Sequence, residues 1–224
     1  MEIAYIIPTL NEGDHLGRTL DSVVKQAGEK EIIVADGGSR DNTLKIARDY
    51  GCLTISTSPG RGTQMNRGAA AAIKDTLLFL HGDTILPNGA SEEVSRILIH
   101  REAMAGAFHL QFEPDSPSLR IFAAFSKINS PLFTYGDQGL FMRKSAFRSI
   151  GGFQEYPILE DVEIQHRIRS RGRFLKSRLP VVTSSRRFTK IGPIRQQLLN
   201  ALILAAYYGR ASPCDLAKLY SHIR

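Results

Sequence analysis

The stretch Glu31-Ile32-Ile33-Val34-Ala35-Asp36-Gly37-Gly38-Ser39 predicts a buried strand that ends on a carboxylate. Its run of Ile and Val without polar alternation is typical of a parallel strand covered on both faces. In an open α/β sheet, ligands bind in the crevice beyond the carboxyl ends of such strands. A carboxylate at that point can accept hydrogen bonds from a ligand hydroxyl or N–H, or it can simply cap the next element. The chain repeats this arrangement at Asp83.

The first half of the chain alternates between apolar runs and helical patterns. The expected strands cover residues 3–7, 32–35, 53–57 and 76–80, with a helix between each pair. This rhythm predicts right-handed βαβ units and a mostly parallel central sheet flanked by helices.

The second half of the chain has a different pattern, and a soft boundary near Phe108 separates the two halves. The expected elements are a half-exposed strand at 107–112, helices at 119–128 and 161–170, and a strand at 180–183. The fold class is therefore α/β, with a helical tail after the last strand.

Length and composition indicate one α/β domain with at most a small extension. The 224 residues are 42% hydrophobic and 23% charged, which is ordinary for a globular chain. The net charge of +7 reflects either a solvated surface or attraction to an anion such as phosphate or an acidic lipid. The two cysteines supply neither a disulfide framework nor a zinc site, which fits a reducing cytosol.

No apolar run reaches the ~20 residues needed to cross a bilayer. The sequence also opens without the basic segment of a signal peptide, so we expect a cytoplasmic protein. The longest apolar run, at residues 198–208, predicts a buried or dimer-forming helix, or a helix that lies peripherally on the inner face of the membrane.

Several short motifs occur in a fixed order along the chain. They are Ile6-Ile7-Pro8-Thr9-Leu10-Asn11-Glu12, Asp36-Gly37-Gly38-Ser39-Arg40-Asp41-Asn42-Thr43, His81-Gly82-Asp83, Gly136-Asp137-Gln138-Gly139, Gly151-Gly152-Phe153 and Glu160-Asp161. This ordered set resembles family 2 glycosyltransferases of the GT-A fold, over roughly residues 3–190, and the later segments resemble a small soluble bacterial-type subgroup. The resemblance implies a single Rossmann-like GT-A domain over residues 1–224. Its parts would be a nucleotide-sugar-binding half at 1–107, an acceptor and catalytic half at 108–190 and a helical tail at 191–224.

For the first two motifs, the resemblance implies contacts with the nucleotide of a nucleotide-diphosphate sugar. Pro8, Asn11 and Glu12 would line the nucleotide pocket. Asp36, with Gly38 in the turn that follows, would hold the uracil or the ribose.

For the later motifs, the resemblance implies the chemistry of a hexosyltransferase-type enzyme. Asp161 would be the general base, with Glu160 beside it, and would deprotonate an acceptor hydroxyl for a one-step, inverting displacement. Asp137 and Gln138 would face the transferred sugar or the acceptor.

The expected metal motif departs from the family pattern. It usually carries two aspartates, and its first position here is His81. The resemblance implies that Asp83 binds the Mn²⁺ or Mg²⁺ that bridges the diphosphate. His81 would be either a second ligand or an ordinary hydrogen-bonding residue. Phosphates and water fill most of the coordination shell of such a cation, so few protein carboxylates are needed.

Two basic segments are further candidates for donor binding. Pro59-Gly60-Arg61-Gly62-Thr63-Gln64-Met65-Asn66 predicts either a plain turn or a loop that enters a helix N-terminus. In the second case its N–H groups and Arg61 suit a phosphate, and Gln64 and Asn66 belong to the same candidate site. Arg187, in Arg186-Arg187-Phe188, either closes over the diphosphate or lies solvated in a surface loop.

The main interpretation is a metal-assisted, inverting glycosyltransferase. Its favoured donor is a UDP-sugar, and its hydroxyl acceptor is unidentified, with lipid-linked acceptors included. One alternative is a sugar-phosphate nucleotidyltransferase, because Gly60-Arg61-Gly62-Thr63 resembles the phosphate loop of that class, although it does not follow the first strand. Another is a non-catalytic protein that binds a nucleotide-sugar or anion. Nucleic acid is not an expected partner, because the basic residues do not interleave with aromatics. The tail leaves homodimer formation and peripheral membrane contact open.

Overall fold

One mixed sheet runs through the part of the chain that the computed structural model describes, residues 2–223 without the side chains of 189–190 and 220–223. Its strands are β1 (Ile3–Thr9), β2 (Lys30–Asp36), β3 (Leu53–Ser56), β4 (Thr76–Phe79), β5 (Thr84–Ile85), β6 (Ala103–Glu113), β7 (Leu140–Arg143) and β8 (Arg173–Ser184). Their order across the sheet is β3-β2-β1-β4-β7-β6-β8-β5.

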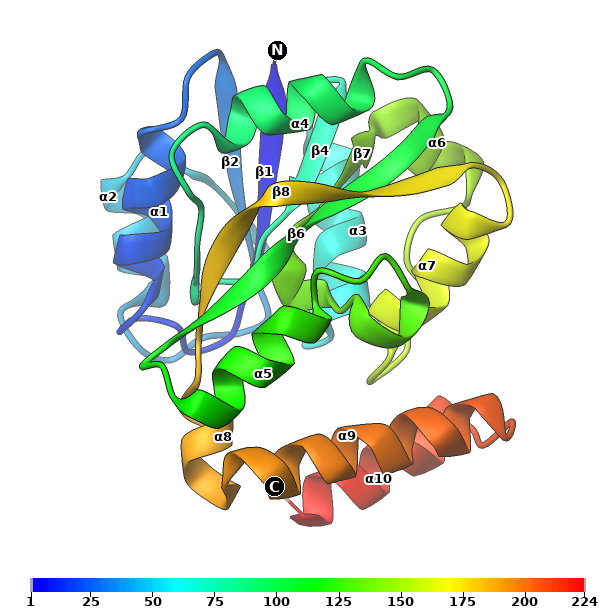
Figure 1. The fold of residues 1–224 in the computed structure, drawn as a ribbon. Coiled ribbons are helices and arrows are strands. Elements are labelled where there is room, and N and C mark those ends of the chain that lie inside the picture. Colours follow the sequence, from blue (N-terminus) through cyan, green and yellow to red (C-terminus); the bar gives the residue numbers. More distant parts are fainter. Residues whose placement is uncertain (1, 224) are drawn as a thin grey trace.

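Helices cover both faces of this sheet and one of its edges (Figure 1). They are α1 (Leu16–Val24), α2 (Thr43–Asp49), α3 (Arg61–Ala71), α4 (Ala90–Leu98), α5 (Pro117–Phe125), α6 (Lys144–Ser149), α7 (Glu160–Arg169), α8 (Arg186–Ile191), α9 (Pro193–Tyr208) and α10 (Pro213–Ile223), with the 3₁₀ helices η1 (Pro131–Phe133) and η2 (Gly136–Gln138). The first core cluster joins α1, α4 and α5 to one face, and the second joins α3, α6 and α7 to the other. The expected α/β sheet flanked by helices, followed by a helical tail, is confirmed.

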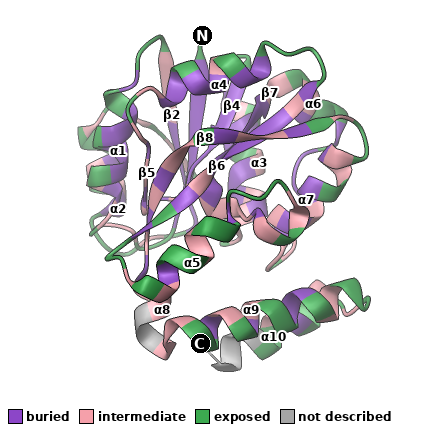
Figure 2. Ribbon diagram, viewed as in Figure 1, coloured by how far each residue is buried: buried purple, intermediate pink, exposed green. Residues whose placement is uncertain are grey.

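Strand β1 lies at the centre of the parallel half, paired in parallel with β2 on one side and β4 on the other. Ile3, Tyr5 and Ile7 enter the first core cluster, and Ala4 and Ile6 enter the second. Figure 2 shows this buried central sheet between more exposed helices. The absence of polar alternation in the sequence therefore has the expected cause, because both faces of the strand are covered.

One strand boundary differs from the prediction. The proline at position 8 suggested that β1 ends at Ile7, but the strand continues to Thr9. Its pairing with β2 extends to Thr9 opposite Asp36, and the Thr9 carbonyl accepts a hydrogen bond of 2.9 Å from the N–H of Gly37. Pro8 is thus an internal residue of the strand, and residues 10–12 emerge directly at the carboxyl edge of the sheet.

The second half of the sheet holds elements that the sequence analysis missed. Strand β7 pairs antiparallel with both β4 and β6, and it carries only four residues, too few for a periodicity to show. Strand β8 begins well before the expected residue 180 and pairs in parallel with β6 across two register shifts. The segment that starts at Arg186, expected as a surface loop, forms helix α8.

The C-terminal helices α9 and α10 pack on each other through Leu199, Ile203 and Leu216. In Figure 1 this pair crosses the lower side of the molecule, below α5 and below the ends of the first parallel strands. Among the described residues, no helix is long and apolar enough to cross a membrane.

The close packing of α3 on β1 gives a test of this core. A Cβ added to Gly68 would lie 2.4 Å from Cγ2 of Ile6, so we expect Gly68→Ala to destabilise the fold by about 1–3 kcal/mol through overpacking. Gly17, in α1, is the matched control because a Cβ there meets no atom within 4 Å. Gly17→Ala should be neutral or raise stability by about 0.4–1 kcal/mol. Urea unfolding of both variants measures the difference, and equal effects would contradict this packing.

Candidate active site

A pocket of about 650 Å³ opens at the carboxyl edge of the parallel strands. It collects most of the residues that the sequence analysis singled out. Those that line it are Pro8, Asn11, Glu12, Arg61, Gln64, His81, Asp83, Asp137, Gln138, Asp161 and Arg187. The remaining candidates, Asp36, Gly38, Asn66 and Glu160, are not part of its lining.

Asp36 is buried and acts on the shape of the neighbouring loops. Its carboxylate accepts hydrogen bonds from Thr9 Oγ1 at 3.0 Å and from the N–H groups of Gly38 and Ser39 at 2.9 and 2.8 Å. The Ser39 hydroxyl also donates to Asp36, at 2.5 Å, and accepts from the N–H of Asn11, at 2.8 Å. Asp36 therefore holds the turn that positions Asn11, whose φ of 54° is a left-handed conformation that Asn adopts readily.

Gln64 and Asn66, on α3, both bind backbone atoms of neighbouring segments. Gln64 Nε2 donates to the carbonyls of Thr9 and Ala35, at 2.8 and 2.7 Å. Asn66 donates to the carbonyl of Phe153 and accepts from its N–H, both at 2.9 Å. Gln64 thereby supports the floor of the pocket, and Asn66 ties α3 to the second half of the chain.

Arg186 connects two acidic side chains of the pocket. Its guanidinium donates to Glu12 and forms an ion pair of 3.1 Å with Asp83 Oδ2. The sequence analysis placed Arg187 in the candidate site but not Arg186, although both side chains line the pocket. Their adjacency was the available signal, because α8 turns both side chains into the pocket lining.

Asp161 lies in the first turn of α7 with its carboxylate held by backbone groups. Oδ2 accepts a hydrogen bond of 2.6 Å from the N–H of Gly136, and Oδ1 accepts one of 2.9 Å from the N–H of Val162. A Cβ on Gly136 would lie 3.1 Å from His81 Nε2 and 3.2 Å from Asp161 Oδ2, so these two side chains flank the glycine.

Glu160 is buried next to Asp161 and does not line the pocket. It forms an ion pair of 2.7 Å with Arg61, which does line the pocket. Burial raises the pKa of Glu160, and the Arg61 guanidinium opposes that rise. The observed contact gives Glu160 a positioning function, since it fixes a cationic side chain in the site.

Asp137 carries a strongly perturbed carboxyl group. Burial, together with the nearby charge of Asp161, raises its pKa to about 6, and its Oδ1 is buried without a hydrogen-bond partner. The adjacent Gln138 accepts a hydrogen bond from Lys176, whose pKa is lowered to about 7 by burial. Lys176 was missed in the sequence, because nothing in the pattern of β8 indicates that its side chain turns inward.

The residues expected to hold a divalent cation form a small donor set. Burial and the guanidinium groups of Arg61, Arg187 and Arg186 hold the pKa of His81 well below its usual range, so its imidazole is neutral and has a free lone pair. With Asp83 it offers one carboxylate and one nitrogen. Among the described residues, no group of three or more His, Cys, Asp or Glu side chains could hold a metal. The donors therefore fit a cation whose remaining ligands come from a diphosphate and water.

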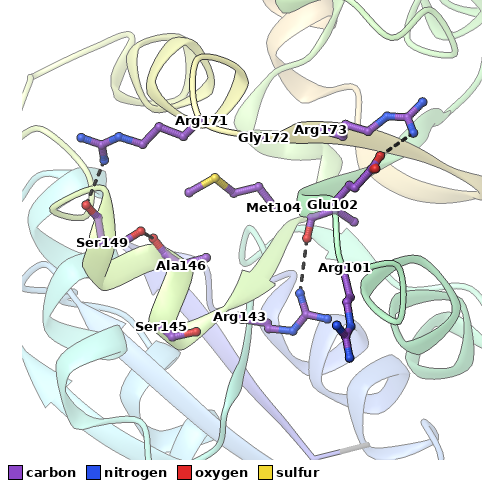
Figure 3. A pocket seen from close by; sticks show the side chains of 11 residues that line it. Arg101, Glu102, Met104, Arg143, Ser145, Ala146, Ser149, Arg171, Gly172 and Arg173 are labelled. Carbon is purple, nitrogen blue, oxygen red and sulfur yellow. Dashed lines mark hydrogen bonds and ion pairs between the residues drawn. The ribbon is translucent and has the colours of Figure 1, made fainter.

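Figure 3 shows a second hollow, of about 670 Å³, near the amino end of β4. Three of the arginines that line it are bonded to nearby oxygens. Arg173 pairs with Glu102 at 2.9 Å, Arg171 donates to the carbonyl of Ser149 at 2.9 Å, and Arg143 donates to the carbonyl of Ala103 at 3.3 Å. None of the candidate residues lines this hollow, so the candidate site is the edge pocket.

The fold and this edge pocket can be compared with known proteins. The model of "Glycosyl transferase family 2" matches residues 5–151. The chain belongs to glycosyltransferase family 2. It is 30% identical over 201 residues to the PGL/p-HBAD biosynthesis glycosyltransferase of Mycobacterium bovis strain BCG, covering 80% of this chain and 74% of that protein.

Two solved structures share the family 2 fold. Staphylococcus aureus TarS (residues 1–349) superimposes with a TM-score of 0.69 at 17% identity, covering 83% of this chain and 61% of that one. The mannosyltransferase PcManGT of Pyrobaculum calidifontis, in complex with GDP-Man and Mn²⁺, gives 0.66 at 18% identity, covering 80% and 56%. These likenesses confirm the GT-A fold, and family membership favours the transferase interpretation over the nucleotidyltransferase and the non-catalytic binder.

The raised pKa of Asp137 predicts how stability depends on pH in this family 2 enzyme. The ordinary pKa of this carboxyl group is 3.8, so ionisation of Asp137 is disfavoured in the folded state. The folded protein therefore loses stability as the pH rises from about 4 to about 6, and the loss remains at higher pH. Asp137→Asn should therefore stabilise the protein at pH 7–8, by on the order of 1 kcal/mol, and change little at pH 4. Thermal unfolding across this pH range measures the difference. If the gain in stability of Asp137→Asn did not grow with pH, the raised pKa of Asp137 would be contradicted.

Proposed function

We propose that this family 2 glycosyltransferase moves a sugar from a nucleotide-diphosphate sugar to an acceptor hydroxyl with inversion at the anomeric carbon, and that Asp161 is the general base. The observation that carries this proposal is the Asp161 carboxylate, held by the N–H of Gly136 and facing a pocket that also contains Arg61, Arg186 and Arg187. A base and a set of cationic side chains in one pocket are what a direct displacement from a diphosphate requires.

The donor fits the half of the pocket built from the parallel strands. Pro8, near the carboxyl end of β1, and Asn11 and Glu12, just after it, would contact the nucleoside, with the Asp36 turn behind them. The guanidinium groups of Arg61 and Arg187 offer charge-assisted hydrogen bonds to the diphosphate. We favour UDP as the nucleotide, because a structure of TarS contains UDP-GlcNAc. GDP is the alternative, because the structure of PcManGT contains GDP-Man. Asp137 and Gln138 would face the transferred sugar.

The chemical step is a single displacement. The acceptor oxygen forms a bond to the anomeric carbon, while the bond from that carbon to the diphosphate oxygen breaks and its electron pair leaves with the nucleoside diphosphate. The acceptor proton passes to Asp161. Because Gly136 and Val162 fix both carboxylate oxygens, the base is oriented before the acceptor arrives, which lowers the cost of reaching the reactive geometry.

Asp83 and His81 would hold Mn²⁺ or Mg²⁺, which when bound neutralises charge on the diphosphate. Arg186 pairs with the same Asp83 carboxylate, at 3.1 Å, and so competes for its Oδ2 oxygen. We therefore expect cation affinity to be low until a nucleotide adds its own phosphate oxygens.

Nucleotide binding is the first test of this function. UDP or GDP at about 100 times its dissociation constant should stabilise the protein by roughly 2.7 kcal/mol, and the effect should require Mn²⁺ or Mg²⁺. Thermal unfolding with UDP, GDP, CDP and dTDP, each with metal and with chelator, measures it. If no nucleotide changes the melting temperature of the folded protein, the proposed donor is wrong.

Asp83→Ala tests the cation site. It should abolish the metal-dependent part of the nucleotide effect, because the carboxylate is the main anionic donor of the site. Asp75→Ala is the matched control, since Asp75 is an exposed aspartate at the opposite end of β4. A metal-dependent shift that survives in Asp83→Ala would remove this residue from the cation site.

Asp161→Asn tests the base. It should leave nucleotide binding nearly intact and lower the rate of sugar transfer or donor hydrolysis by about 10²-fold or more. Glu163→Gln, on the same helix and paired with Arg167 outside the pocket, is the control for a lost charge on α7. Turnover near that of the wild type would show that another group takes the proton.

A further inference from the structure

The pocket has a second, apolar part next to the catalytic carboxylate. Side chains from α5, η1, the loop before α7 and α9 form its walls. We call this part the apolar compartment, and its main lining residues are Phe122, Phe125, Phe133, Leu159, Leu199 and Ile203. Apolar walls of this extent leave bound water without hydrogen-bond partners, so an apolar ligand is favoured there.

The walls of the compartment are ordered by contacts with one another. The rings of Phe125 and Phe133 are stacked with centroids 5.3 Å apart, and Phe122 stacks on Phe188 at 6.3 Å. On the other side, Leu199 and Ile203 of α9 belong to the small core shared with α10. The side chains that line the compartment are therefore held in place by packing on both sides.

The polar side chains of α9 do little to offset this apolar character. Gln196 Nε2 donates to Asn200 Oδ1 at 2.8 Å, and Asn200 Nδ2 donates to Gln197 Oε1 at 3.2 Å. These amides thus use part of their hydrogen-bonding capacity on one another along the helix, and the rest of the compartment wall is apolar.

Exposed apolar side chains continue the compartment outward on both sides. On the α5 side, Ile121, Phe125 and Leu132 are 58%, 45% and 45% exposed. On α9, Leu198 and Leu202 are 61% and 68% exposed, one position along from the buried Leu199 and Ile203. Figure 2 shows this exposure along α5 and α9. A surface helix that is apolar on both its inner and outer sides indicates a ligand or surface that is itself apolar.

The compartment meets the base at Leu159. This residue has a φ of 66°, a strained left-handed conformation for a leucine, and it directly precedes Glu160 and Asp161. The same turn thus places an apolar side chain and the catalytic carboxylate side by side in one pocket. An alcohol with its hydrocarbon part in the compartment would present its hydroxyl near Asp161.

We propose that the apolar compartment binds the hydrocarbon chain of a long-chain alcohol, the lipid acceptor of the sugar. This assignment rests on the proposed function, because it uses Asp161 as the group that receives the hydroxyl proton. It limits the acceptor class to molecules with an extended apolar part, and it gives helix α9 a direct role in acceptor selection.

Binding of a pyrene-labelled dodecanol to the full chain tests the proposal, followed by fluorescence and by competition with unlabelled alcohols. Affinity should rise by about fourfold for each carbon from hexanol to decanol, as expected for burial of successive methylene groups. Glycerol should not compete. Leu199→Trp, which fills the compartment, should weaken binding by roughly tenfold or more while the nucleotide effect on melting is unchanged.

Ile99→Trp is the control, since Ile99 is 76% exposed at the end of α4 and does not line the pocket. If Leu199→Trp does not fold, Phe133→Ala, which removes one stacked ring, replaces it and should also weaken binding. Nucleotide binding without alcohol binding overturns this proposal and leaves the transferase proposal intact. A dimer in which the second copy closes the compartment would also overturn the proposal of an alcohol acceptor. Absence of any nucleotide effect overturns the transferase proposal instead.

Discussion

Backbone hydrogen bonds between β1 and its two parallel neighbours, β2 and β4, fix the position of the chain at three loops at once. Because all three strands run in the same direction, their carboxyl ends meet at one edge, and the residues that follow each strand are brought together there. Asn11, Asp36 and His81 lie at or just beyond the ends of these three strands. Close packing of α3 against Ile6 through Gly68 keeps this edge in place, since no side chain separates helix from strand.

The second half of the chain completes the site through a few contacts with the first. The N–H of Gly136 holds Asp161, and Arg186 reaches back to Glu12 and Asp83. Helix α9 then closes the apolar side of the pocket. The pocket is therefore lined by parts of the sequence that are far apart, including helix α9 of the C-terminal tail.

Charge in the pocket is arranged at the expense of stability. Asp137 is buried near Asp161 with an oxygen that has no partner, and its pKa is raised to about 6. Burial, together with the charges of nearby arginines, lowers the pKa of His81 and holds it neutral. The left-handed Leu159 adds backbone strain close to Asp161 in the sequence. Such strained and poorly paired groups concentrate at functional sites, because a substrate can satisfy them when it binds.

The sequence by itself determined the parallel half of the fold, since the run around Asp36 has the composition of a strand buried on both faces, and it indicated the family through the order of its motifs. Local pattern could not find β7, which is too short for a periodicity, nor the helix that starts at Arg186. Only the tertiary structure decided which candidates face the pocket: Glu160 turns to Arg61, and Asp36 binds its own loops. The physical reason is that the direction of a side chain depends on partners distant in sequence. The side chain of Lys176, for example, turns inward to donate a hydrogen bond to Gln138.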